Sequence, residues 1–286
     1  MKKLLFTLHL YVGLTAAFFL ICISLSGAMI AFEPELNRAF HPELTNVTPV
    51  AQPLNWDEFR TRVEQQSPGW KLIRFYFPDQ PNWSTYVRLR NVATHKIRHV
   101  YVDQYTGKVL GSTEDGSNWI IKVHDLHVNF LSGKIGNQIV TWSTVGLLVL
   151  SLSGIILWWP GVMNWRRSLT VNWKSSFARL NWDLHNTLGF WCFLFVLMWG
   201  ISGIYFAFPD MFNAIVGFLQ TPSTIGKVQF GDIALLWLSN LHFGRFGWFS
   251  EAIWTLIGLV PAVLSFTGIF MCCHRLLVRK GAPMPM

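Results

Sequence analysis

An apolar segment near the N-terminus is repeated in the middle of the chain. Residues 8–32 and 184–208 align at an offset of 176 positions, and each segment begins with a Leu-His dipeptide, at His9 and at His185. A Ser-Gly pair also recurs near the end of both segments. Self-similar segments indicate a fold built from equivalent units. The repeat therefore predicts two helices in the same role, each with one histidine near one membrane face.

The number and length of the apolar runs predict a membrane protein with four spans. A transmembrane helix needs about 20 predominantly apolar residues, and four runs reach that length. Composition agrees, because 13% of the residues are charged and 51% are hydrophobic, whereas soluble domains carry roughly 25% charge. The predicted fold class is a membrane all-α four-helix bundle with a small α+β domain inserted between spans 1 and 2.

These features divide the chain into consecutive segments. They are 1–33 for span 1, 34–122 for the inserted domain, 123–160 for a junction and span 2, 161–183 for a loop, 184–210 for span 3, 211–246 for a second loop, 247–274 for span 4 and 275–286 for a tail. Within the inserted domain, Asn55 is expected to cap a short helix that reaches Gln66. Residues 71–77, 83–90 and 97–103 are predicted to be antiparallel strands.

Basic residues set the expected orientation of the spans. Nine lysines and arginines lie before span 1, between spans 2 and 3 and after span 4, and cytoplasmic segments of membrane proteins carry such an excess. Both termini and the loop 161–183 are therefore expected in the cytoplasm. The net charge of +8 is then a topology signal, so no nucleic-acid partner is expected. The N-terminus also resembles a cleaved signal peptide, but the repeat favours a retained span.

One Leu-His dipeptide lies at the start of each span. His9 and His185 enter their spans from the cytoplasmic side, whereas His127 and His242 enter theirs from outside. A ligand site in a helix bundle uses side chains from facing helices, and paired imidazoles in an apolar bundle suit the axial positions of haem iron. We therefore predict two haem sites, with His9 and His185 on the inner haem and His127 and His242 on the outer haem.

Other interpretations of these residues stay open. An interfacial histidine can contact lipid headgroups instead of a metal, and His124 or His274 is the alternative ligand on its side. Zinc is less favoured, because no spacing brings three or four ligands to one point. No CxxCH motif occurs, so any haem is held without thioether bonds. Four hydroxyl-glycine pairs within the spans are interpreted as close helix-packing positions: Ser26-Gly27, Ser153-Gly154, Ser202-Gly203 and Thr267-Gly268.

Several motifs resemble the PepSY-associated transmembrane family. They are the LHxxxG start of spans 1 and 3, the YVDQYTGKVLG segment at residues 101–111 and the Leu-His before span 4. Within that family the chain is most similar to the ferric-siderophore reductases of the bacterial inner membrane. The resemblance implies a PepSY-type periplasmic domain, two haem b groups and electron transfer to iron in the periplasm. It carries haem ligation over to the histidines of the Leu-His motifs, His9, His127, His185 and His242.

The leading hypothesis is a dihaem b-type membrane reductase, an oxidoreductase that passes electrons from the cytoplasmic side to a periplasmic ferric siderophore and releases Fe(II). No dinucleotide-binding fingerprint such as GxGxxG occurs, so the electron donor is expected to be a separate cytoplasmic protein or a quinol. Membrane lipid is the other expected partner. The alternatives are a non-catalytic PepSY membrane protein that binds an envelope partner, and a quinol-linked cytochrome with another acceptor.

A ferric chelate must approach the outer haem, which places the expected substrate site at the outer ends of the spans. Three acids lie there, Glu33, Glu35 and Asp210, although the prolines beside them also mark ordinary solvated helix ends. Arg245 is expected to pair with a haem propionate or, in the alternative interpretation, with a lipid phosphate. Four aromatic residues are predicted to wall the site: Trp119, Phe130, Phe243 and Phe246.

Overall fold

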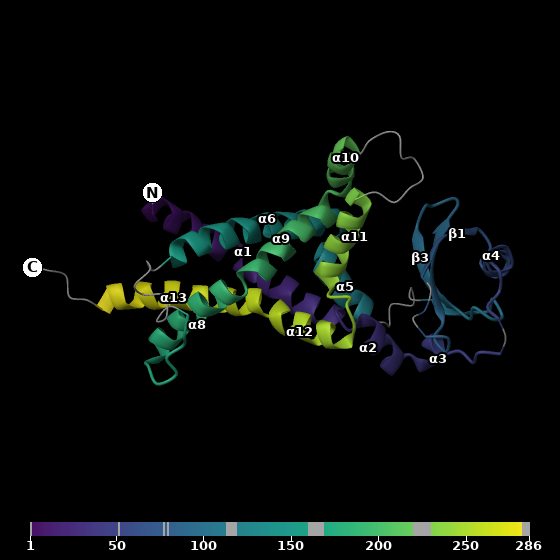
Figure 1. Ribbon diagram of the computed structural model, residues 1–286, viewed down its shortest axis with the longest axis horizontal. Helices are drawn as coiled ribbons and strands as arrows, with labels where there is room; N and C mark the ends of the chain where they lie inside the picture. The colour runs from purple at the N-terminus through teal and green to yellow at the C-terminus, as the bar shows by residue number, and fades with distance from the viewer. Residues whose placement is uncertain are drawn as a thin grey trace, which may run out of the picture. The chain divides into compact units, whose positions relative to one another are not determined.

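The computed structural model (Figure 1) describes residues 2–50, 52–76, 78, 80–112, 119–159, 169–219 and 230–281. The chain forms two compact units. We call them the helical unit, made of Met1–Ala31 and His124–Met286, and the mixed unit, made of Phe32–Val123. The described part of the helical unit contains the apolar helices, and the mixed unit contains a four-stranded sheet.

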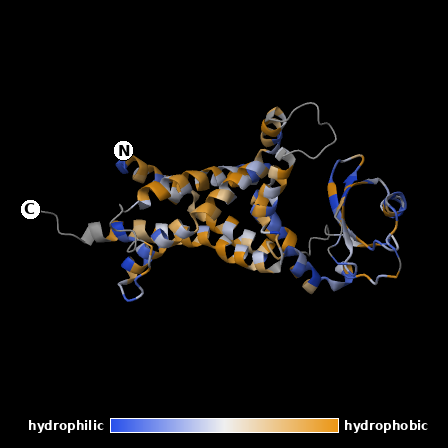
Figure 2. Cartoon of the chain, viewed as in Figure 1, coloured by the Kyte–Doolittle hydropathy of each residue, from blue (hydrophilic) through white to orange (hydrophobic). Residues whose placement is uncertain are grey.

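Among the described residues, three helices are long and apolar enough to cross a membrane. They are α1 (Lys2–Ile30), α6 (Gly133–Trp158) and the segment Phe249–Leu277, which takes in most of α12 (Trp248–Gly258) and α13 (Val260–Gly281). Figure 2 shows hydrophobic residues along most of their length. Large apolar side chains such as Phe18 and Trp142 are exposed on these helices. Exposed apolar surface of this kind matches a lipid environment.

The remaining candidate span is broken in the middle. α8 (Phe177–Trp191) and α9 (Phe193–Ala207) are apolar enough to cross a membrane as a pair, but they meet at a bend of 64°. The break falls at Cys192, whose ψ of 4° lies outside the helical range. The two halves have different main packing partners: α8 packs chiefly against α13 and to a lesser extent against α6, whereas α9 packs chiefly against α6. The sequence predicted one uninterrupted span here, and the structure shows a bent pair of helices instead. The described residues therefore hold three spans, or four if the bent pair counts as one.

Segments that the sequence assigned to loops contain further helices. α8 begins at Phe177, within the predicted loop 161–183, and the predicted loop 211–246 contains α10 (Pro209–Leu219) in large part and α11 (Phe230–Phe243). Another helix, α5 (Trp119–Asn129), precedes α6. The start of α1 and the end of α13 lie at one end of the helical unit, whereas α5 and α11 lie at the other (Figure 1).

The mixed unit packs a helix on an antiparallel sheet. The strands lie in the order β1 (Trp70–Tyr76), β2 (Thr85–Asn91), β3 (Ile97–Val102) and β4 (Val109–Ser112). α4 (Trp56–Gln65) covers the sheet, and two shorter helices, α2 (Glu33–Phe40) and α3 (Pro42–Thr45), precede it. All strand pairs are antiparallel. The three predicted strands are confirmed to within two residues at either end, and β4 adds a fourth strand after them.

The mixed unit has a hydrophobic core of its own. α4 contributes Phe59 and Val63, and the sheet contributes Leu72, Val87, Leu89, Val100 and Val102. Each fully buried side chain of this size stabilises the unit by roughly 1.5–3 kcal/mol. The start of α4 is as predicted, because Asn55 Oδ1 accepts a hydrogen bond from the N–H of Glu58 at 2.9 Å.

Candidate functional site

The four histidines of the Leu-His dipeptides lie on four different helices. His9 is on α1 and His185 on α8, while His127 is on α5 and His242 on α11. The ring centroids of His127 and His242 are 6.4 Å apart, at an interplanar angle of 66°. His9 and His185 are close enough to interact electrostatically. The structure thus brings together two pairs of histidines, which we call the His9/His185 pair and the His127/His242 pair.

Each of these histidines makes a polar contact through Nδ1. Three of the partners are hydroxyl groups: Ser153 Oγ for His9 at 2.8 Å, Thr267 Oγ1 for His185 at 2.8 Å and Ser202 Oγ for His242 at 2.7 Å. The Nδ1 of His127 lies 2.9 Å from the carbonyl oxygen of Ile23 and 3.4 Å from Ser26 Oγ. His185 also has a backbone partner, the carbonyl of Leu264. All four contacts join different helices, so they also fix how these helices pack.

The hydroxyl groups accept these hydrogen bonds. Each hydroxyl lies 2.6–2.8 Å from a carbonyl oxygen one turn earlier in its own helix: Ser26 from Cys22, Ser153 from Val149, Ser202 from Met198 and Thr267 from Val263. Two oxygen atoms at that distance need a hydrogen between them, and a hydroxyl has only one to give. The hydrogen of the other contact must then come from the imidazole. All four rings are therefore assigned as Nδ1–H tautomers, which keeps the lone pair of Nε2 for a metal.

Glycines lie beside three of the histidine rings. An added Cβ would lie 2.8 Å from His127 Cε1 at Gly27, 3.3 Å from His9 Cε1 at Gly154 and 3.5 Å from His185 Cε1 at Gly268. Gly203 differs, because its Cβ would meet Thr144 at 2.7 Å. The predicted close packing is confirmed at Gly27, Gly154 and Gly203, whereas the distance at Gly268 is that of an ordinary van der Waals contact.

The sequence interpretation missed the hydroxyl groups beside these glycines. A signal for them was present in the repeat: 17 residues separate His9 from Ser26, and the same number separates His185 from Ser202. A histidine and a hydroxyl that recur at one spacing indicate a shared role for both. Neither hydroxyl serves the histidine of its own helix, however, and for that reason the spacing did not reveal which residues it contacts.

Two tryptophans hold the end of α11. Trp199 Nε1 donates to the carbonyl oxygen of His242 at 3.1 Å, and Trp254 Nε1 donates to that of Leu241 at 2.6 Å. The last carbonyl groups of a helix have no partner within the helix. Here the indole groups of α9 and α12 donate hydrogen bonds to these carbonyl groups. The position of His242 is therefore fixed by its backbone as well as by its ring.

The alternative ligands have other surroundings. His124 is close enough to His127 to interact with it electrostatically, but its side chain is 46% exposed and its Nδ1 lies 3.9 Å from Asp125 Oδ1. His274 stacks on Phe270 of its own helix, with ring centroids 5.8 Å apart. The four paired histidines therefore differ from His124 and His274 in having a polar contact to another helix that orients the ring.

The predicted substrate rim divides between the two units. Glu33, Glu35 and Trp119 belong to the mixed unit. There Glu35 forms an ion pair with Arg38 at 2.5 Å. Burial, together with the negative charge of Glu33, raises the pKa of Tyr101.

The other rim residues belong to the helical unit. Asp210 lies in the first turn of α10. The aromatic residues make ring contacts: Phe130 with Phe19 at 5.4 Å, Phe243 with Phe206 at 5.5 Å and Phe246 with Trp237 at 5.6 Å. The guanidinium of Arg245 lies 4.5 Å from the ring centroid of Phe243, a cation–π contact. The three aromatic residues and Arg245 therefore take part in packing within the helical unit.

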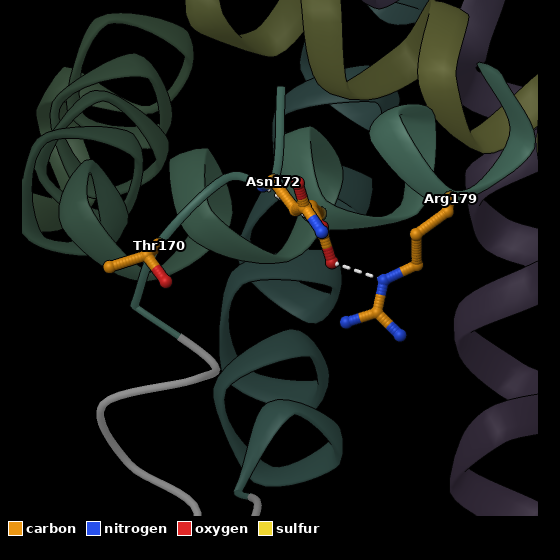
Figure 3. Close-up of a pocket in the computed structure, with 4 residues that line it drawn as sticks. Thr170, Asn172 and Arg179 are labelled. Atoms are coloured by element: carbon orange, nitrogen blue, oxygen red, sulfur yellow. Dashed lines mark hydrogen bonds and ion pairs between the residues drawn. The ribbon is translucent and has the colours of Figure 1, made fainter. Parts of the chain in front are cut away.

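A polar cavity lies beside the start of α8 (Figure 3). It has a volume of about 320 Å³ and is lined by Thr170, Asn172, Arg179 and Asp183. The buried carboxylate of Asp183 accepts hydrogen bonds from Arg179 Nε at 2.9 Å and from the N–H of Asn172 at 3.2 Å. Arg179 and Asp183 are four residues apart on one helix face. Their ion pair joins the first two turns of α8, and His185 follows Asp183 two residues later.

The chain matches one known family. A model of the PepSY-associated TM region matches residues 6–228, from α1 through α10, and ends before α11. His242 and Thr267 consequently lie beyond the matched residues. A search among curated proteins finds no match. By the extent of the family match, the chain belongs to the PepSY-associated transmembrane family.

Proposed function

We propose that the protein is a dihaem b-type reductase of the bacterial inner membrane. It would pass electrons from the cytoplasmic side to a periplasmic ferric siderophore and release Fe(II). The observation that carries this proposal is the set of two histidine pairs in which each ring is held through Nδ1 and keeps the Nε2 lone pair. Ionisable side chains within membrane segments are rare and mark functional sites.

The histidine pairs suit haem iron better than a bare metal ion. The porphyrin supplies four ligands to the iron, so the protein needs to add only one or two. No group of three or more His, Cys, Asp or Glu is placed to hold a metal ion in the part of the chain that the structure describes. Two metal–nitrogen bonds of about 2 Å and the inner halves of two imidazole rings add to roughly 6 Å. The 6.4 Å between the centroids of His127 and His242 agrees with that sum.

The residues that would hold the two haem b groups follow from this fit. His9 and His185 would hold one haem, and His127 and His242 would hold the other. Arg245, three residues after His242, would pair with a propionate. When bound, the two groups would supply one-electron transfer at both ends of a hydrocarbon core about 30 Å thick. The apolar helices would exclude water from the imidazole rings, and the hydroxyl groups orient these rings.

The basic residues support an orientation in which the His9/His185 pair lies near the cytoplasm. Lys2 and Lys3 precede His9 in the sequence, and positive charge collects on the cytoplasmic side. The electron donor would then be a quinol or a separate cytoplasmic protein. The acceptor gains one electron, and Fe(III) becomes Fe(II). A hard oxygen chelator holds the less charged Fe(II) more weakly, so the metal is released.

A spectrum of the purified protein tests the first half of the proposal. The oxidised and reduced forms should show the bands of low-spin b-type haem, at two haems per chain. Ferric siderophore added to the dithionite-reduced protein should then reoxidise it far faster than buffer does. A protein without haem contradicts the proposal, and so does reoxidation no faster than in buffer.

The same measurements separate the two alternatives. A non-catalytic PepSY membrane protein would bind its envelope partner through the mixed unit, which has its own hydrophobic core, and it would contain no haem. A quinol-linked cytochrome would show both haems but would be reoxidised by an acceptor other than a ferric siderophore.

A further inference from the structure

In each half of the helical unit, a hydroxyl group on one helix contacts a histidine on another helix. In the first half, Ser153 on α6 contacts His9 on α1, while α1 in return contacts His127, just ahead of α6, through Ser26 and the Ile23 carbonyl. In the second half, Thr267 on α13 contacts His185 on α8. The bent span returns a contact, since Ser202 on α9 contacts His242 on α11. Every span thus supplies a hydroxyl for a histidine that another span or its leading helix carries.

This arrangement is more than ordinary back-bonding of serine and threonine in helices. A hydroxyl that bonds only its own i−4 carbonyl gains little and contacts nothing else. Ser151 on α6 and Ser265 on α13 donate to the carbonyls of Leu147 and Pro261, each at 2.8 Å, with no histidine in either bond. Ser153 and Thr267, two residues further along the same helices, make that bond and also accept from a histidine.

The second bond has a chemical consequence at the ring. A hydroxyl that donates to a carbonyl is polarised by that bond and becomes a better acceptor. An acceptor on Nδ1–H makes the opposite nitrogen a more basic ligand and fixes the tautomer and the orientation of the ring. A more basic axial ligand stabilises the ferric state and so lowers the reduction potential.

We infer that Ser153, Thr267 and Ser202 are positioning residues that set the haem affinity and the reduction potential of the site each one serves. The inference rests on the proposed function, because it needs haem at the histidine pairs. Ser26 has a smaller share in the same role. Its Oγ is 3.4 Å from His127 Nδ1, whereas the Ile23 carbonyl is 2.9 Å away and belongs to the backbone, which no side-chain substitution removes.

Thr267 offers the sharpest test, because two substitutions separate its hydroxyl from its shape. Thr267→Val keeps the branched side chain and removes the hydroxyl that accepts from His185 Nδ1, leaving the Leu264 carbonyl as the partner of that ring, whereas Thr267→Ser keeps the hydroxyl. Ser265→Ala is the matched control, since it removes a back-bonding hydroxyl from the same helix. The measurements are haem titration of the apo-protein, potentiometric titration of both haems and the low-spin ferric EPR signal.

Thr267→Val should weaken haem binding at one of the two sites by about 10- to 100-fold. It should also raise the midpoint potential of that haem and change its EPR signal, and leave the other haem as in the wild type. Thr267→Ser and Ser265→Ala should match the wild type. Should Thr267→Val fail to fold, Ser153→Ala with Ser151→Ala as its control makes the same test at His9, and Ser26→Ala should have the smallest effect.

The outcomes distinguish this inference from the function on which it rests. Two haems in the wild type, with affinities and potentials that Thr267→Val and Ser153→Ala leave unchanged, overturn the inference and leave the dihaem proposal standing. A wild-type protein that binds no haem overturns both. Equal effects of Thr267→Val and Ser265→Ala also overturn the inference, because the change would then follow from the helix and not from the bond to His185.

Discussion

Four histidines share one local chemistry although they lie on four different helices. Each ring donates through Nδ1 to an oxygen of another helix, at 2.7–2.9 Å. A bond of this length aligns the ring and determines which nitrogen carries the proton. The chemistry expected of the site therefore depends on four Nδ1 atoms and their four oxygen partners. Substitutions of single residues test it most directly.

Substitution of His185 tests the proposed assignment of ligands. His185→Ala should leave one haem per chain, because it removes one axial ligand from the His9/His185 pair and none from the His127/His242 pair. His274→Ala is the control and should leave two, since that ring stacks on Phe270. Haem content by the pyridine haemochrome assay is the measurement. Two unchanged bis-histidine signals in His185→Ala would rule out this pairing.

Glu64 makes the stability of the mixed unit depend on pH. Its carboxylate is 16% exposed and accepts bonds from Lys71 Nζ, the Leu72 N–H and Arg60 Nε at 2.9, 3.0 and 3.2 Å. Burial alone would raise the pKa of Glu64, but these bonds outweigh it and lower the pKa. In acid the unfolded chain then binds more protons than the folded chain. The contribution of Glu64 to the stability of the mixed unit is therefore fully present above the ordinary pKa range of a carboxyl group, and it is lost as the pH falls through the lowered pKa.

Glu64→Gln should therefore cost about 1–3 kcal/mol at neutral pH and should abolish this acid sensitivity. Hydrogen exchange of the amides in β1 to β3, measured in the full chain at neutral and acid pH, reports both effects. Glu58→Gln is the control, because the Glu58–Arg62 pair is exposed on α4 and contributes little. A wild-type unit whose protection does not fall in acid would contradict the prediction.

Helices rather than residues decide how the histidines approach one another. α5 reaches α1 where α1 carries the Ser26-Gly27 pair, and the aromatic contact of Phe130 with Phe19 holds the end of α5 against the same helix. α8 and α9 meet at a bend of 64°, and their main packing partners differ, α13 for α8 and α6 for α9. The bend lets one span carry His185 towards α13 and Ser202 towards α11.

Gly27 is where this packing between α1 and α5 is tightest. Gly27→Ala would place a Cβ 2.8 Å from His127 Cε1, which is too close for the ring to keep its position. We expect one haem to be lost or to become five-coordinate, as seen in the optical and EPR spectra. Gly13→Ala on the same helix is the control, since its Cβ would meet Leu150 Cδ2 at an ordinary 3.5 Å. Identical spectra for both variants would show that Gly27 is not needed for the approach.

The whole molecule combines two units with separate interiors. The mixed unit is stabilised by a compact hydrophobic core. The helical unit exposes large apolar side chains and contains buried hydroxyl groups at its helix contacts, including Ser26 and Ser202. The first pattern is that of a water-soluble domain, and the second is that of helices that pack in lipid through small and polar residues.

Reporter fusions test the topology of the whole chain. Fusions at Gly281 and after Arg167 should report the cytoplasm, and fusions near Gly107 should report the periplasm, because the basic residues lie in the first two regions. The start of α1 and the end of α13 at one end of the helical unit agree with this (Figure 1). A mature N-terminus near Ala31 would contradict the prediction, since cleavage there removes His9 and Ser26.

Much of the local structure could be predicted because its causes are local. Apolar runs of sufficient length identified α1, α6 and the last span, and Asn55 identified the start of α4. The recurrence of the Leu-His dipeptide picked out the four histidines, and the offset of 176 residues linked His9 to His185 in the sequence itself. Hydropathy, capping and repetition need no knowledge of which helix lies beside which.

Only the tertiary structure decided what contacts these histidines. Ser153 lies 144 residues from His9, and Thr267 lies 82 residues from His185, so no local pattern links them. The bend at Cys192 is equally non-local, because continuous hydropathy cannot show that α8 and α9 have different neighbours. The bonds that orient the rings arise where helices distant in sequence pack together, and packing depends on the shapes of both partners at once.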